Sequence, residues 1–99
     1  MSLKIKRLPR ARIDRTAIWL HVAEDSIAAA DRLTDRFDEI VGHLADFPQA
    51  GRERTELADG LRAFPVDHYL VFYRVTPTAL EIVRIFHTSR KITPDMLSD

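Results

Sequence analysis

The chain has 99 residues, of which 45% are hydrophobic and 30% are charged, and its formal net charge at pH 7 is zero. This length suits one domain over residues 1–99 with one modest core, and the composition is that of a folded chain. The lack of cysteine excludes disulfides and thiolate metal sites and is compatible with a reducing cytoplasm. No apolar run approaches the roughly 20 residues that cross a bilayer, and none follows the basic N-terminus as in a secretory signal.

The zero net charge conceals segregated charges. In residues 1–15 the one acidic residue is Asp14, against six basic residues: Lys4, Lys6, Arg7, Arg10, Arg12 and Arg15. Residues 24–46 are mainly acidic, with only two arginines. The pattern favours a charged partner, although ordinary solvated surface charge explains it as well.

The N-terminal part predicts a strand and then a helix. Residues 3–8 alternate apolar and basic side chains, which indicates a short half-exposed strand that Pro9 ends. Residues 10–23 are predicted to be helical. Their apolar positions form two stripes, Ala11–Ile18–Val22 and Ile13–Ala17–Leu20, with Trp19 between them. A helix that is apolar on two sides is expected to pack against two elements.

The next segment predicts a longer helix with one apolar side. Asp25 or Ser26 is suited to cap its start, and Pro48 follows its end. Because only a few residues separate the two helices, we expect an antiparallel hairpin. The apolar positions recur every three or four residues, as expected of a core-facing helix: Ala30, Leu33, Phe37, Ile40, Leu44 and Phe47.

The C-terminal half predicts a sheet. The polar segment Gln49–Ala58 is interpreted as an exposed loop. Leu61–Val66, Tyr69–Val75 and Ala79–His87 are rich in Val, Ile, Phe and Tyr, and the short connections between them favour an antiparallel meander. The predicted fold class is therefore α+β, in the order β-α-α-β-β-β, with a helical hairpin against a small and mostly antiparallel sheet.

Three polar residues stand at predicted strand positions where folding does not require them: Arg62, Arg84 and His87. With a carboxylate from Glu53 or Glu56, such groups can cleave RNA. The carboxylate would accept the 2′-hydroxyl proton, the arginines would stabilise phosphate charge, and histidine would protonate the leaving oxygen. The structural alternative is that both arginines pair with Glu53, Glu56 or Glu81 and that His87 caps a strand end.

Other chemistry finds little support in the sequence. The four histidines lack metal-ligand spacing, and the chain has neither a glycine-rich phosphate loop nor a nucleophile elbow. We therefore expect no cofactor and no metal. Arg7, Arg10 and Arg12 are suited to contact nucleic acid, but no nucleic-acid-binding motif accompanies them.

Taken together, the residues resemble the toxin subunits of the RelE/ParE family of bacterial toxin–antitoxin modules over nearly the whole chain, and the predicted element order is that family's fold. The matching pieces occur in order along the sequence: residues 17–20 (AIWL), 44–52 (LADFPQAGR), 60–62 (GLR), 69–75 (YLVFYRV), 83–87 (VRIFH) and Arg90.

The resemblance implies one of two activities. RelE-like members cut messenger RNA on the ribosome, whereas ParE-like members block DNA gyrase. Arg62, Arg84 and His87 match nuclease positions, but no lysine pair precedes Arg62, and Thr88 stands where an aromatic residue often follows the histidine. The Trp19 helix and the turn at residues 47–52 look more ParE-like. We therefore predict a gyrase-inhibiting toxin that arrests growth, with a RelE-type endoribonuclease using Glu56, Arg62, Arg84 and His87 as the alternative.

The resemblance also implies a cognate antitoxin, whose disordered segment folds onto the toxin and through which alone the toxin meets DNA. The oligomeric state, homodimer or toxin–antitoxin hetero-oligomer, stays open. The chain's own residues Thr93–Asp99 are an alternative occupant of the toxin's apolar grooves. The residues expected to bind the antitoxin or the target are Trp19, Arg52, Arg62, Tyr73, Arg84 and Arg90.

Overall fold

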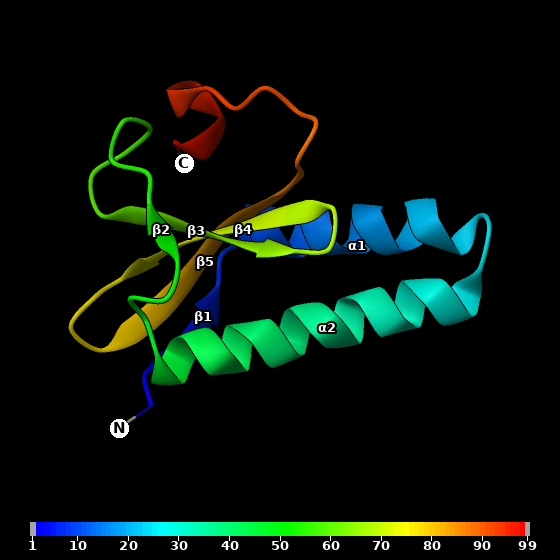
Figure 1. Ribbon diagram of the computed structural model, residues 1–99, viewed down its shortest axis with the longest axis horizontal. Helices are drawn as coiled ribbons and strands as arrows, with labels where there is room; N and C mark the ends of the chain where they lie inside the picture. The colour runs from blue at the N-terminus through cyan, green and yellow to red at the C-terminus, as the bar shows by residue number, and fades with distance from the viewer. Residues whose placement is uncertain (1, 99) are drawn as a thin grey trace.

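The computed structural model describes residues 2–98 (Figure 1). Strand β1 (Lys4–Arg7) leads into helix α1 (Pro9–Ala23), and a short connection joins it to helix α2 (Ile27–Asp46). The remaining elements follow in chain order: β2 (Arg52–Glu53), β3 (Leu61–Val66), β4 (Tyr69–Val75), β5 (Ala79–His87) and the 3₁₀ helix η1 (Pro94–Leu97). The predicted order is confirmed, with a short extra strand and a C-terminal 3₁₀ turn.

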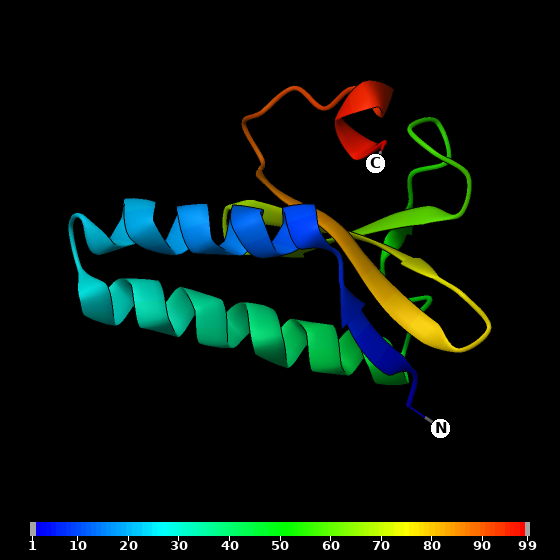
Figure 2. The same cartoon turned by 180° about the vertical axis from the view of Figure 1, so that it is seen from behind.

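The strands form one five-stranded sheet in the order β1-β5-β4-β3-β2. Strands β3, β4 and β5 make the predicted antiparallel meander, whereas β1 lies parallel to β5 at one edge. The two helices form an antiparallel hairpin on one face of the sheet, and the C-terminal segment lies over the other (Figures 1 and 2). The α+β fold class is therefore confirmed, with a mixed rather than purely antiparallel sheet.

The ends of the helices follow local sequence chemistry. Pro9 occupies the first turn of α1, where its missing N–H and fixed φ are tolerated. The side chain of Ser26, rather than that of Asp25, caps α2 by accepting a hydrogen bond from the Ala29 N–H at 3.1 Å. Within residues 2–98, no helix is long and apolar enough to cross a membrane.

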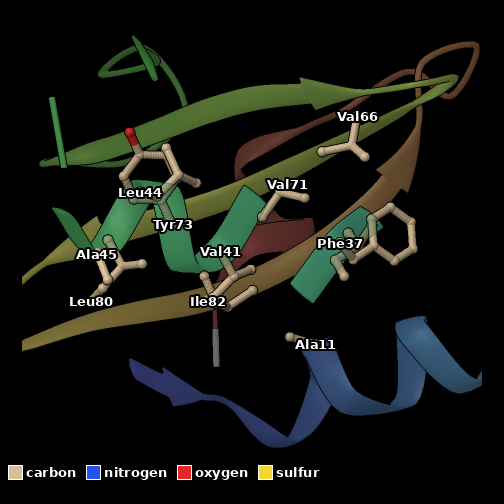
Figure 3. Close-up of a cluster of buried hydrophobic side chains, with 11 residues drawn as sticks. Ala11, Phe37, Val41, Leu44, Ala45, Val66, Val71, Tyr73, Leu80 and Ile82 are labelled. Carbon is tan, nitrogen blue, oxygen red and sulfur yellow. The ribbon is translucent and has the colours of Figure 1, made fainter. Parts of the chain in front are cut away.

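Two apolar clusters lie on the two faces of the sheet. The first fills the space between the sheet and the helices, and Figure 3 shows its central members: Ala11, Phe37, Val41, Leu44, Ala45, Val66, Val71, Tyr73, Leu80 and Ile82. The second cluster, on the opposite face, contains Leu61, Ala63, Phe72, Val83, Phe86 and Leu97. Two clusters on opposite faces explain why β4 is apolar on both sides.

The C-terminal segment covers part of the second cluster. Leu97 is only 5% exposed, and Ile92 and Met96 pack beside it. Burying a leucine side chain of this kind contributes about 1.5–3 kcal/mol. The alternative that the chain's own C-terminus fills an apolar groove is thus confirmed up to Leu97, whereas Asp99 lies outside the described residues.

A β-bulge in β5 sets the direction of its polar residues. Phe72 pairs with Arg84 and Tyr73 pairs with Ile82, so Val83 is the extra residue. A bulge shifts the alternation of the side chains beyond it. Residues that lie directly opposite each other in an antiparallel pair point to the same face. Arg84 therefore shares the face of Phe72, on the side of the second cluster.

Helix α1 packs against two elements, α2 and β5, as its two apolar stripes predict, but one of the stripes is left uncovered. Ala11 and Ile18 belong to the first cluster. By contrast, Ile13 is 67% exposed, Leu20 is 57% exposed, and Ala17 between them is exposed as well. The helical hairpin is a single layer, so no element among residues 2–98 covers these three residues, which are called the outer stripe below.

The segment Gln49–Ala58, predicted as an exposed loop, is partly ordered by the sheet. Its residues Arg52–Glu53 form β2 against β3. Gly51 is buried: its N–H donates to the Tyr73 hydroxyl at 2.7 Å, and that hydroxyl donates to the Pro48 carbonyl at 2.8 Å. A Cβ on Gly51 would overlap the phenol ring, so the close approach requires glycine.

We expect Tyr73→Phe to lower the free energy of unfolding by about 1–3 kcal/mol, because it leaves the Gly51 N–H without its buried acceptor. Urea denaturation measures the change. Tyr69→Phe is the matched control, since the Tyr69 ring is half-buried and its hydroxyl has no hydrogen-bond partner among residues 2–98. Equal stability of the two variants would contradict the expectation.

The same hydroxyl predicts an alkaline instability. Burial raises the pKa of Tyr73 above its ordinary value, so folding favours the protonated phenol. This contribution is complete below the unfolded pKa of about 10 and is lost as the pH rises above it. The wild-type protein should therefore lose more stability than Tyr73→Phe between neutral pH and strongly alkaline pH, as measured by denaturation at a series of pH values.

Candidate functional site

Arg84 makes the most extensive polar contacts of the candidate site. Its Nε donates to Asp14 Oδ2 at 2.7 Å, its Nη2 donates to Asp14 Oδ1 at 2.9 Å, and its Nη1 donates to the Met96 carbonyl at 3.0 Å. The Arg84 and Asp14 side chains are only 11% and 13% exposed, and the guanidinium also lies 4.4 Å from the Phe86 ring centroid. This bidentate, partly buried pair serves the fold, because it joins α1, β5 and the C-terminal segment.

Asp14 is the polar partner that the sequence interpretation missed. The structural alternative paired Arg84 with Glu53, Glu56 or Glu81, but Asp14 lies 70 residues away in sequence and also accepts the Ile85 N–H at 2.9 Å. One sequence signal was present: Asp14 is the lone carboxylate among six basic residues of the N-terminal segment.

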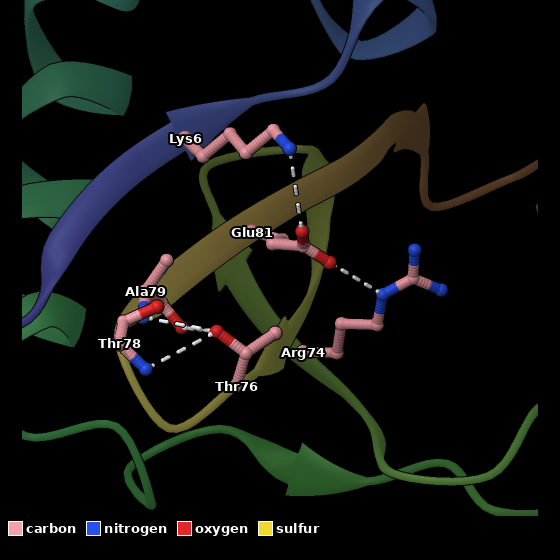
Figure 4. A network of polar contacts seen from close by, with 6 residues as sticks. All are labelled: Lys6, Arg74, Thr76, Thr78, Ala79 and Glu81. Carbon is pink, nitrogen blue, oxygen red and sulfur yellow. Dashed lines mark hydrogen bonds and ion pairs between the residues drawn. The ribbon is translucent and has the colours of Figure 1, made fainter.

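Glu81 pairs elsewhere. Its carboxylate accepts from Arg74 Nε at 2.8 Å and lies 3.9 Å from Lys6 Nζ, as Figure 4 shows. Glu81 thereby connects β1, β4 and β5 on a part of the sheet that precedes the bulge.

Arg62 is held at another place and on the other face of the sheet. It lies opposite Tyr73, whose ring belongs to the first cluster, so its side chain is on the helix-covered face. Its guanidinium donates to the Gly51 carbonyl at 2.8 Å and to Glu53 Oε1 at 3.2 Å. The pair with Glu53 agrees with the structural alternative. Within residues 2–98, Arg62 and Arg84 share no hydrogen-bond partner and point to opposite faces.

Glu56 is a poor candidate for a general base. Its carboxylate accepts from Arg54 Nε at 2.8 Å. This hydrogen bond, with a further contribution from its own backbone N–H, lowers the pKa of Glu56 below its usual value. A carboxylate with a lowered pKa is a weaker base, so the contact opposes the predicted proton transfer.

His87 is exposed at the end of β5. Its Nδ1 accepts the Ser89 N–H at 3.1 Å and lies 2.7 Å from Ser89 Oγ, which is the strand-end cap considered in the structural alternative. The His68 ring stacks beside it with centroids 6.2 Å apart, and Tyr69 approaches edge-on at 5.2 Å.

A hollow of about 350 Å³ separates α1 from the end of β5. His87 and Arg90 line it from the strand side, and His21 lines it from the helix. The sequence interpretation did not single out His21, which enters only because α1 lies beside β5 in the fold. No cluster of three or more metal-ligating side chains occurs among residues 2–98.

The residues expected to bind a partner differ in accessibility. Arg52 and Arg90 are exposed, and Trp19 is half-buried with its Nε1 donating to Asp31 Oδ1 at 2.9 Å. Tyr73 is fully buried under α2 and the residue 48–51 turn, whereas the binding roles of these residues stay predictions. Sequence alternation alone does not tell which face of a strand is covered, so the burial of Tyr73 is evident only in the fold.

The helical hairpin over a mixed sheet, with its strand arginines neutralised internally, defines a RelE/ParE-like protein, as the sequence predicted. The chain belongs to the ParE toxin family, because its residues 5–92 match the profile described as ParE toxin of type II toxin-antitoxin system, parDE. It is accordingly a ParE-type toxin of a toxin–antitoxin system, and membership of this family implies a cognate antitoxin partner.

Individual relatives agree with this placement. Toxin ParE3 of Caulobacter vibrioides is 32% identical over 73 residues, which cover 73% of both chains. Toxin RelE2 of the same organism is 35% identical over 81 residues, covering 82% of this chain and 90% of the relative. A structure of the chromosomal ParDE system from P. aeruginosa superposes with a TM-score of 0.74 at 22% identity, covering 87% of this chain and 96% of the other.

We expect Arg84→Ala to destabilise the protein by about 3–5 kcal/mol, because it leaves Asp14 as a partly buried charge without a counterion. Denaturant unfolding measures the change. Arg36→Ala is the matched control: Arg36 is 53% exposed and its two ion pairs are 3.8 and 3.9 Å long, so a loss of about 0–1 kcal/mol is expected.

Wild-type stability of Arg84→Ala would contradict the structural role of the pair. If the variant is destabilised, any loss of toxicity in it reports on folding and cannot by itself identify Arg84 as catalytic. A double-mutant cycle with Asp14→Asn separates the pair from other contacts of either residue.

Proposed function

We propose that this toxin arrests growth by binding and inhibiting DNA gyrase in the cytoplasm, and that a cognate antitoxin neutralises it. The observation that supports a protein-binding rather than a nucleolytic mechanism is the separation of the strand arginines. Arg62 is bound on the helix-covered face, and Arg84 is bound to Asp14 on the opposite side. General acid–base cleavage requires groups that converge on one phosphate.

The surface offers an apolar area for a protein target near the end of α2. Phe47 is 61% exposed, and the His43 ring packs against it with centroids 5.1 Å apart. The turn that follows, residues 48–50, lines the same shallow depression. Exposed aromatic side chains flanked by polar groups are typical of protein-binding surfaces, and exposed Arg52 follows two residues after this turn. We propose this area as the gyrase contact.

A RelE-type endoribonuclease is the second candidate, and one observation favours it. The hollow between α1 and β5 brings His87, His21 and Arg90 together in accessible positions. Such groups are able to bind a phosphate and to donate a proton. In this reading His87 would act as the acid, but Arg62, Arg84 and Glu56 would remain outside the site that contains it.

The proposal predicts that the purified toxin, freed of antitoxin, inhibits supercoiling of relaxed plasmid by gyrase, while ribosome-bound transcripts stay intact. His87→Ala and Glu56→Gln should inhibit supercoiling as strongly as the wild type, because both side chains are exposed and neither lies in the Phe47 area. Phe47→Asp should weaken inhibition without changing the unfolding temperature.

Transcripts cleaved on expression, with cleavage abolished by His87→Ala, would instead establish the endoribonuclease. Full supercoiling activity at saturating toxin would overturn the gyrase proposal even in the absence of cleavage. Expression without antitoxin, followed by a growth measurement, first establishes that the chain is toxic, and its failure would point to a domain that only binds antitoxin.

A further inference from the structure

The outward side of α1 carries an apolar surface and a basic surface next to each other. The apolar part is the outer stripe, Ile13, Ala17 and Leu20. Beside it lies a hollow of about 400 Å³, called the arginine hollow below, which is lined by Arg7, Arg12, Arg15, Thr16 and Asp38. Arg12 and Thr16 border both features, so the two form one continuous surface.

The arginine hollow has more positive than negative charge. Its one carboxylate, Asp38, lies 2.8 Å from Arg15 Nη2 and 3.5 Å from Arg7 Nη2. Arg12 forms no ion pair with any of residues 2–98. Arg15 Nε is buried and has no acceptor within that range. Three arginines therefore share one carboxylate in the hollow, and an added carboxylate would be complementary to the remaining positive charge.

We propose that this surface binds an amphipathic segment of the antitoxin, with apolar side chains on the outer stripe and a carboxylate in the arginine hollow. On α1, Ile13, Ala17 and Leu20 are three and four residues apart, so they lie on one side of that helix. The apolar side of an amphipathic partner segment is complementary to such a row. That the partner is the antitoxin depends on the proposed function. That the bound segment is amphipathic and acidic follows from the surface itself.

The outer stripe and the arginine hollow together favour one kind of binding partner over others. A nucleic acid would satisfy the arginines but would leave the outer stripe in water. A second copy docking through its own α1 would bring more arginines, and the single carboxylate of α1, Asp14, is already bound to Arg84. An acidic amphipathic peptide is complementary to both parts of the surface.

The test measures binding of the purified chain to the purified protein encoded beside its gene, by titration calorimetry. Leu20→Asp and Arg12→Glu should each weaken binding at least about tenfold, which corresponds to about 1.4 kcal/mol. Val75→Asp and Lys91→Glu are matched controls, because both residues are exposed and neither lines the proposed surface. Unchanged unfolding temperatures show that the variants remain folded.

A charge reversal in the partner completes the test: replacing one acidic residue of its bound segment by lysine should restore binding to Arg12→Glu. If the wild-type chain binds the partner and both α1 variants bind equally well, the docking surface is wrong and the proposed function stands. If the wild-type chain does not bind at all, the antitoxin part of the proposed function fails together with the inference.

Two other outcomes also overturn the inference. A wild-type dimer that Leu20→Asp converts to a monomer, measured by sedimentation, would assign the outer stripe to a second copy. DNA binding by the isolated chain that Arg12→Glu abolishes would assign the arginine hollow to nucleic acid.

Discussion

The ion pair between Arg84 and Asp14 is the contact on which the arrangement of the other parts depends. It fixes α1 against β5 beyond the bulge, and the third donor of the same guanidinium binds the backbone of the C-terminal segment. A second arginine at the start of α1, Arg10, adds a 2.8 Å hydrogen bond to the Ser98 carbonyl. The helical layer, the sheet and the C-terminal segment therefore meet at one partly buried charge, which Asp14 neutralises.

The structural role of Arg84 shows that a residue at a family position does not by itself establish an activity. A fold can carry the same residue types at the same strand positions and still use them for different purposes. Arg62 illustrates the point, because three acceptors, including the Gly51 and Gln49 carbonyls, already surround its guanidinium. Such a residue supports the turn after α2, and its presence in the sequence says little about chemistry on a substrate.

The sequence predicted what local patterns encode. The three- and four-residue spacing of apolar side chains predicted α2, although Phe47 at the end of the pattern lies beyond the helix and is exposed. The β-branched and aromatic runs predicted β3, β4 and β5. Strand β2 was missed because two residues carry no periodicity and are ordered only by pairing with β3. Asp14 was missed because its partner is distant in sequence, and the bulge at Val83 reversed the alternation from which the direction of Arg84 would have been inferred.

The packing of α1 shows a second limit. The two apolar stripes of this helix were correctly located, but a pattern does not say whether the second stripe is covered by the chain itself. In this fold the helical hairpin is one layer thick, so Ile13 and Leu20 remain exposed. A sequence pattern identifies an apolar face of a helix, and only the fold shows whether the chain itself covers that face.

The parallel pairing of β1 with β5 has a consequence for how the protein is made. Lys4 lies opposite Ala79 and Arg7 lies opposite Ile82. Strand β1 therefore gains its neighbour in the sheet only when β5, the last strand, is in place. Contacts between such distant parts of a chain close late and slow folding. During synthesis the helical hairpin can form while β5 is still inside the ribosome, but the sheet cannot close. The sheet therefore closes only after β5 has been synthesised, and until then β1 has no strand beside it in the sheet.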